Sequence, residues 1–207
     1  GYEASLRIGL AVQPFMFQRG FMATPTCGTL GAALAVGKLL RFSPADMAGA
    51  LGAASTYAGG LAQFYKSGSI IKRINGGKAA ECGVIAALLT REGIWGPRDI
   101  LEGKEAGFFR AFAEKSDPAR VTGDLGRGYR LMEVSTKIHA GAGRLQASND
   151  AGLLLGSEHG LTPEQIIEVE VGIPKVIEGM LTKADPPDLQ SAQLSVPFSL
   201  AMALSLG

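Results

Sequence analysis

Two adjacent cations interrupt an apolar stretch of small residues, which is an unusual place for charge. Lys72 and Arg73 come before the double glycine Gly76 and Gly77, after which an alanine-rich helix is expected. Side-chain cations beside a helix start, where backbone N–H groups lack internal partners, are typical of a site that binds an anion. A surface turn with solvated charges would contain the same residue types. Residue types alone therefore leave both interpretations open.

The overall composition excludes several classes of function. The 207 residues carry a formal net charge of +1, and their basic residues are scattered, so no surface for nucleic acid or an anionic membrane is indicated. The longest apolar runs are far shorter than the roughly 20 residues that span a bilayer, and no signal peptide opens the chain. We expect no nucleic-acid or membrane partner and a cytoplasmic location.

Cysteine and histidine are too few and too far apart for a metal centre. Cys27 and Cys82 each lie in an apolar helical context and are predicted to be buried thiols, which leaves no disulfide framework or four-cysteine site. His139 and His159 show no spacing typical of zinc ligands. The prediction is chemistry without a metal or another cofactor.

Helical periodicity, punctuated by glycine and proline, runs through the first 115 residues. Ser43 is expected to cap a helix whose first residue is Pro44. Small residues are dense enough for helices to approach closely, which indicates a packed all-α layer. The helices are expected at residues 3–12, 28–41, 44–57, 78–92, 97–103 and 106–113.

The pattern changes after a polar, glycine-rich segment at residues 116–128, which is the best candidate for a domain boundary. Alternation predicts strands at 129–137 and 166–173, with a helix at 142–158 between them. We therefore expect part of an all-helical domain over 1–128 and part of an α+β domain over 129–207. Both ends read as helices already under way, so we expect a fragment of a longer protein.

Three segments, taken in order, resemble the MmgE/PrpD family, which includes 2-methylcitrate dehydratase and cis-aconitate decarboxylase. The first is Arg19–Thr29, the second runs from Lys72 to Gly83, and the third is Thr136–Ala140 with Asp150 downstream. The resemblance implies a mainly α protein: a large helical domain is followed by a smaller α+β lid, with the active site between them. It also implies a homodimer, and catalytic residues in an N-terminal part that precedes this sequence.

The resemblance further implies a cofactor-independent hydro-lyase of the 2-methylcitrate dehydratase type. It would abstract a proton α to a carboxylate of a small di- or tricarboxylic acid. Lys72 and Lys137 fall on the family's two active-site lysines, which suits binding of carboxylates when a lid closes. Arg73 or Arg144 would assist. The base would be Lys137, His139 or a residue of the preceding part.

Several site positions allow a second interpretation. His139 follows Lys137 by two and would share its face in an extended segment, although one structural hydrogen bond would explain it equally well. Thr24 is expected to bind substrate or to cap the following helix. Asn75 and Gln146 stand where the family motifs have histidine, so they can hydrogen-bond a carboxylate but cannot titrate.

Met22 stands where the first motif segment of the family has histidine, and it can neither transfer a proton nor donate a strong hydrogen bond. Two alternatives to dehydration therefore stay open. One is an epimerase or decarboxylase that acts on similar acids. The other is a family member that has lost catalysis and serves as a binding or structural subunit.

Overall fold

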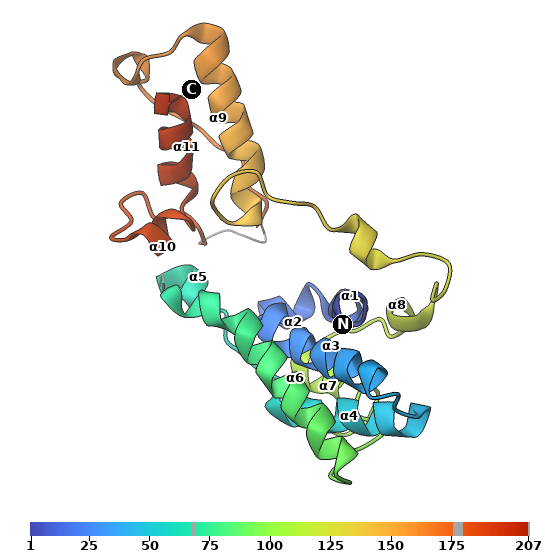
Figure 1. Cartoon of the computed structure of the whole chain (residues 1–207). Coiled ribbons are helices and arrows are strands. Elements are labelled where there is room, and N and C mark those ends of the chain that lie inside the picture. The colour runs from blue at the N-terminus through green and yellow to red at the C-terminus, as the bar shows by residue number, and fades with distance from the viewer. Residues whose placement is uncertain (68, 176–179, 207) are drawn as a thin grey trace. The chain divides into compact units, whose positions relative to one another are not determined.

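A computed structural model describes residues 1–67, 69–175 and 180–206 of the chain (Figure 1). The chain divides into two compact units. The first unit comprises Gly1–Ala62 and Ile71–Val134, and the second comprises Gln63–Ile70 and Ser135–Gly207. The division into domains at residues 128 and 129 stays a prediction. Among the described residues, no helix combines the length and the apolar character needed to cross a bilayer.

The first unit is built from helices, which confirms the prediction of a mainly helical protein. Its longest members are α3 and α6, and the 3-10 helix η1 leads directly into α6 because Ile74 keeps helical backbone angles. The elements are α1 (Tyr2–Val12), α2 (Phe15–Gln18), α3 (Ala23–Leu39), α4 (Pro44–Tyr57), η1 (Ile70–Ile74), α6 (Asn75–Arg91), α7 (Phe108–Phe112), α8 (Ala119–Thr122) and η2 (Arg130–Glu133).

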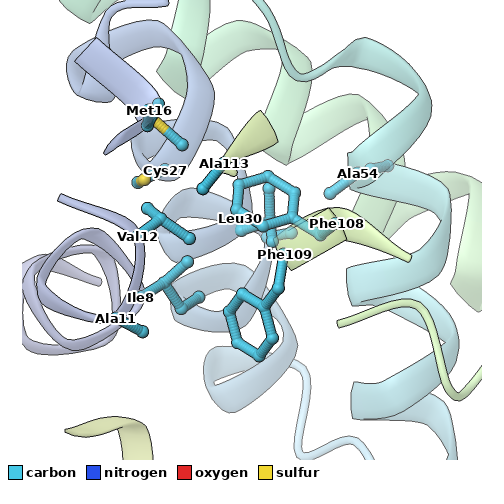
Figure 2. Close-up of a cluster of buried hydrophobic side chains, with 12 residues drawn as sticks. Ile8, Ala11, Val12, Met16, Cys27, Leu30, Ala54, Phe108, Phe109 and Ala113 are labelled. Carbon is cyan, nitrogen blue, oxygen red and sulfur yellow. The ribbon is translucent and has the colours of Figure 1, made fainter. Parts of the chain in front are cut away.

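The core of the first unit forms where α3 packs against α1, α4 and α6. Figure 2 shows side chains from α1, α3 and α7 meeting in one cluster. Val12 and Leu30 are completely buried, and Phe108 is 2% exposed. Burial of apolar surface of this kind stabilises a fold by about 25 cal/mol per Å² removed from water.

A close contact between α3 and α6 depends on small residues. A Cβ atom added to Gly28 would lie 3.2 Å from the Ala79 Cβ, and one added to Gly83 would lie 2.4 Å from the Ala32 Cβ. Positions four residues apart on α3 therefore face positions four residues apart on α6, in the same order. The two helices run parallel and begin at the same end.

Local signals in the sequence explain the start of α4. The Ser43 hydroxyl accepts the backbone N–H of Asp46 at 3.2 Å, and the Asp46 carboxylate accepts the Ser43 N–H at 3.3 Å. This reciprocal capping box satisfies two N–H groups that the first helical turn leaves without partners. The predicted cap and the predicted range 44–57 are both confirmed.

The expected helix at residues 97–103 is wrong, because this stretch forms turns. The Ile100 carbonyl accepts the N–H of Phe108 at 2.6 Å, and the Leu101 carbonyl accepts the N–H of Phe109 at 3.2 Å. These carbonyls pair across a loop rather than along a helix.

Arg7 ties the segment after α7 to α1. Its side chain is 3% exposed and forms ion pairs of 2.6 Å with both Glu3 and Asp124. It also donates to the carbonyls of Val121 and Gly128, at 3.3 and 3.1 Å. The polar segment 116–128, which we expected at a boundary, is thus held against α1.

The strand predicted at residues 129–137 is wrong, since this stretch contains the 3-10 helix η2 followed by irregular chain. The Glu3 carboxylate accepts the N–H groups of Arg130 and Leu131, at 3.1 and 3.0 Å. The Arg130 guanidinium in turn pairs with Asp124 and Glu133, each at 2.6 Å. The Glu3 carboxylate therefore binds two backbone N–H groups that would otherwise be available to pair with a neighbouring strand.

The second unit is centred on two helices that pack side by side, α9 and α11 (Figure 1). A Cβ added to Gly152 would lie 2.6 Å from Leu200 and 3.1 Å from Ala203, so the glycine permits this contact. The described elements are α5 (Phe64–Ser67), η3 (Gly143–Leu145), α9 (Gln146–His159), η4 (Pro163–Gln165), α10 (Leu189–Ala192) and α11 (Val196–Leu206). The helix predicted at 142–158 corresponds to η3 and α9.

The second predicted strand, at residues 166–173, is also wrong for the described part of the chain, which contains no strand there. Val169 and Val171 instead line a small apolar cavity of about 290 Å³, together with Val196 and Leu200 of α11. The alternating pattern reflects side chains that face a helix. The expected α+β character of this region is therefore corrected to helices and irregular chain among the described residues.

Candidate functional site

The first group of predicted site residues lies at the junction of η1 and α6. Lys72 and Arg73 belong to η1, and Asn75 is the first residue of α6, which begins earlier than the expected residue 78. Lys72 and Asn75 are half-buried, whereas Arg73 is exposed. One continuous helical turn therefore carries both cations and the amide.

A groove in the first unit runs between α1, α3 and the start of α6. It has a volume of about 770 Å³, and Thr24 lines it from α3 while Gly76 lines it from α6. Since α3 and α6 run parallel, the positive ends of both helix macrodipoles lie at this end of the groove. Thr24, Gly76 and the neighbouring Asn75 therefore lie where a negatively charged group is favoured.

Two residues near the start of α3 are unsuited to proton transfer. Met22 stands at the N-cap position without a capping side chain, and its N–H donates to the Gly60 carbonyl at 3.0 Å. Burial raises the pKa of the Cys27 thiol to about 12, so this group stays protonated at neutral pH. Both cysteines are buried and free, as the sequence predicted.

The second group of site residues lies in the second unit, on the loop that precedes α9. The Lys137 ammonium donates to the Gly141 carbonyl at 3.0 Å. The Gln146 side chain accepts the N–H groups of Ile138 and His139, at 3.0 and 2.9 Å, and donates to the His139 carbonyl at 3.1 Å. The first residue of α9 thus fixes the loop that carries Lys137 and His139.

His139, on the loop before α9, has an acidic neighbour on that helix. Its Nε2 atom lies 2.6 Å from Oδ1 of Asp150, and the exposed fractions of the two side chains are 20% and 61%. Gln146 and Asp150 are four residues apart on α9 and therefore share one face of the helix. That face holds both the backbone and the imidazole ring of His139.

Arg144 lies on η3 and is exposed. Its charge acts on Tyr65 of α5: burial raises the pKa of the Tyr65 hydroxyl, and the nearby Arg144 cation partly opposes this shift. Arg144 is thus placed near a phenol of its own unit.

The structure brings the predicted residues together in two groups, one in each unit. The sequence did not single out Asp150 as a site residue, although its spacing from Gln146 is the signal that could have done so. In the part of the chain that the structure describes, no cluster of three or more histidine, cysteine or acidic side chains is placed to hold a metal ion.

Comparison with known proteins supports the resemblance of the three motif segments. A family model described as the MmgE/PrpD N-terminal domain matches residues 1–121. The cis-aconitate decarboxylase-like protein oryM of Aspergillus oryzae is 33% identical over 150 residues, which cover 69% of this chain and 31% of that protein. A cis-aconitate decarboxylase of Aspergillus terreus is 28% identical over 224 aligned residues, which cover 99% of this chain and 44% of that protein. The chain thus spans less than half the length of these relatives. Because the family model matches more than half of the chain, the chain belongs to the MmgE/PrpD family.

Proposed function

We propose that this chain carries part of the active site of a cofactor-independent lyase that acts on a small di- or tricarboxylic acid. The observation that carries the proposal is the loop before α9, which carries Lys137 and His139 two residues apart and is fixed by Gln146. A cation and a group that can transfer protons on one loop are what abstraction of a proton α to a carboxylate requires. The names of the fungal relatives, a cis-aconitate decarboxylase and a cis-aconitate decarboxylase-like protein, support this class of substrate.

The proposed roles follow from side-chain chemistry. Lys137 and Lys72 bind carboxylates of the substrate and stabilise the negative charge that develops on an enediolate, with Arg73 or Arg144 assisting. His139 or Lys137 transfers the proton, from the α carbon in dehydration or to the carbanion in decarboxylation. Asn75 and Thr24 hydrogen-bond the substrate beside the start of α6. Closure of a lid over a site shared by two domains stays part of the proposal.

Within this class, decarboxylation is favoured over dehydration because the named relatives are decarboxylases. The two reactions need the same bound carboxylates and differ in the leaving group. Loss of CO₂ from a β,γ-unsaturated acid leaves a carbanion that must be protonated, whereas loss of water begins with removal of a proton. Epimerisation would need proton removal and return alone.

A second candidate function is a carboxylate-binding subunit without catalysis. Specific observations favour it: Met22 caps α3 through its backbone, and Gln146 uses its amide on the loop backbone. Neither residue can titrate, although the family motifs have histidine at both positions. This alternative keeps the proposed ligand and removes the reaction.

The test uses the purified protein at its full encoded length. It is incubated with cis-aconitate, and separately with 2-methylcitrate, in D₂O, and the products are followed by NMR. We expect release of CO₂ from cis-aconitate and incorporation of deuterium beside a carboxylate. Binding of both acids without exchange, CO₂ release or water loss would overturn the lyase and favour the non-catalytic subunit.

The site assignment is tested with methionine, which keeps the length of a lysine side chain and removes its charge. Lys72→Met and Lys137→Met are each expected to raise KM at least tenfold, about 1.4 kcal/mol of lost binding. Lys38→Met is the control, because Lys38 is exposed in the last turn of α3. Equal KM values for all three variants would remove the lysines from the site.

A homodimer and a cytoplasmic location remain parts of the proposal that rest on the family and the composition. Sedimentation at several concentrations measures the first, and imaging of the tagged protein measures the second. A monomer at every concentration would contradict the dimer.

A further inference from the structure

We propose that Asp150 is a positioning residue that orients the imidazole of His139 and selects its tautomer. The inference rests on the proposed function, because it assigns His139 as the group that exchanges a proton with substrate. It gives a role to a residue that the third motif segment contains but that was not assigned to the site.

The first step is the geometry of the pair. His139 Nε2 lies 2.6 Å from Asp150 Oδ1, a short distance of the kind found in charge-assisted hydrogen bonds. An ionised carboxylate has only acceptor atoms, so the hydrogen of a neutral ring must be on Nε2. Nδ1 then keeps its lone pair, and within the described residues no group bonds to it.

The second step is the way in which the loop is held. Gln146 accepts the N–H of His139 at 2.9 Å and donates to its carbonyl at 3.1 Å, so both backbone groups of His139 are fixed by one amide. Asp150 follows Gln146 by one helical turn on the same face of α9. One helix face therefore sets the position of the His139 backbone and the rotation of its ring.

The third step is the chemistry that this arrangement permits. When Nδ1 takes the proton from the carbon α to a carboxylate, the C–H electron pair moves into the enediolate and the ring becomes imidazolium. The positive charge then lies beside the Asp150 carboxylate, as in other carboxylate–histidine pairs. Return of the proton from Nδ1 to the same carbon gives exchange or epimerisation and restores the neutral ring. In the favoured decarboxylation, the imidazolium instead donates its Nδ1 proton to the carbanion that loss of CO₂ leaves, and water then returns a proton to Nδ1.

The pair is at the surface, since the Asp150 side chain is 61% exposed, and this excludes a large role in folding. Removal of the Asp150 carboxylate should therefore leave the unfolding midpoint almost unchanged while it changes the tautomer of the His139 ring. A merely structural contact would not produce that combination.

The experiment uses the 207-residue chain with ¹⁵N-labelled histidine, whose only two rings belong to His139 and His159. Long-range ¹H–¹⁵N spectra are recorded at a pH where both rings are neutral. His159 is exposed at the end of α9 and serves as the reference. We expect a single Nε2–H tautomer for His139, with a ring N–H proton protected from exchange, and a mixture of tautomers for His159.

Asp150→Ala should convert His139 to a mixture like that of His159 and remove the protected proton. Asp150→Asn, which keeps the side-chain shape, should also lower the Nε2–H fraction, because an amide can donate as well as accept. Glu168→Ala is the control: it removes an exposed carboxylate from the same unit and should leave His139 unchanged. In the full-length enzyme, Asp150→Ala should lower kcat by roughly tenfold or more with little change in KM.

A wild-type His139 that shows the mixture seen for His159, or an Asp150→Ala ring that keeps one tautomer, would overturn the inference. The spectra need no substrate, so this failure is distinct from failure of the proposed function. An enzyme inactive on every acid, with the ring behaving as expected, would overturn the lyase and leave the positioning of His139 by Asp150 supported.

Discussion

Arg7 in the first unit and His139 in the second unit are both held by acidic neighbours, yet their networks differ in one respect. The Arg7 guanidinium is buried and makes four hydrogen bonds, two to carboxylates and two to carbonyls. The His139 ring has one acidic partner, at Nε2, and its other nitrogen has no partner among the described residues. A side chain bonded on several sides links segments of chain, whereas one with an unbonded nitrogen atom keeps the lone pair that the proposed proton transfer needs.

The two networks also differ in how far apart in the sequence their bonded residues lie. Arg7 joins groups that are more than a hundred residues apart in the sequence, as its bond to Asp124 illustrates. His139, Gln146 and Asp150 lie within twelve consecutive positions. The Arg7 network of the first unit joins distant segments of chain, whereas the His139 network of the second unit is local.

The largest expected effect is on activity, from His139→Ala. Loss of a group that transfers protons should lower kcat by about 100- to 10,000-fold. The free energy of unfolding should change by less than about 0.5 kcal/mol, as for a surface substitution. Steady-state kinetics and urea unfolding of the same preparation measure both. A variant that loses stability but keeps its kcat would place His139 with Arg7 as a structural residue.

The second effect is on stability, from Arg7→Met, which keeps a long apolar side chain and removes every donor. The hydrogen bond from Arg7, opposed by burial, holds the pKa of Asp124 below its ordinary value of 3.8. A carboxyl with a lowered folded pKa contributes stability above its ordinary pKa and loses it as the pH falls through the folded value. The variant should therefore be clearly less stable than wild type at about pH 6 and closer to it at about pH 3.

Urea midpoints at the two pH values measure this effect. A stability difference that stays constant between the two pH values would show that Arg7 acts through packing of its aliphatic stem and not through Asp124.

A smaller effect on stability is expected from Gly83→Ala, where the new Cβ would lie 2.4 Å from Ala32 and 2.6 Å from the Thr29 carbonyl. Overpacking of this kind costs about 1–3 kcal/mol. Gly77→Ala in the same helix is the matched control, because no atom lies within 4 Å of its added Cβ, and it should stabilise by about 0.4–1 kcal/mol. Thermal unfolding should show that the Tm falls in Gly83→Ala and rises in Gly77→Ala. Two shifts of the same sign would contradict the close packing of α3 on α6.

The smallest effect on stability is expected from Gln146→Leu, which removes the bonds that hold the loop at His139. Because these groups are near the surface, water replaces the lost partners, and unfolding should change by about 1 kcal/mol or less. Activity should fall, although less than in His139→Ala. Gln146→Glu keeps the two accepted bonds and should give an intermediate activity. Full activity in both variants would show that the loop needs no support from α9.

Helices with local start signals could be predicted from the sequence. Ser43 and Asp46 form a capping box within four residues, and the predicted range 44–57 agrees with α4. The helix expected at 97–103 and the strand expected at 129–137 were wrong for a shared reason. In each stretch, backbone groups form hydrogen bonds outside the predicted element: the Ile100 carbonyl accepts the Phe108 N–H, and the Leu131 N–H donates to the Glu3 carboxylate.

The candidate site could be predicted in part. The motifs placed Lys137, His139 and Gln146 near one another because the positions are close in sequence, and the structure describes them on one loop and helix. The pairing of His139 with Asp150 could not be predicted, because it depends on how the loop folds back on α9. The meeting of Lys72 and Lys137 at one ligand stays a proposal.

By itself the sequence determined the family, the helical character and the positions of the cations, because these depend on residue types and on spacing along the chain. Only the tertiary structure decided that Arg7 is buried among partners, that Gly83 lies against α3 and that His139 has an acidic neighbour. Hydrogen bonds and packing contacts act over a few ångströms and in set directions. They are therefore decided by which groups the folded chain brings together.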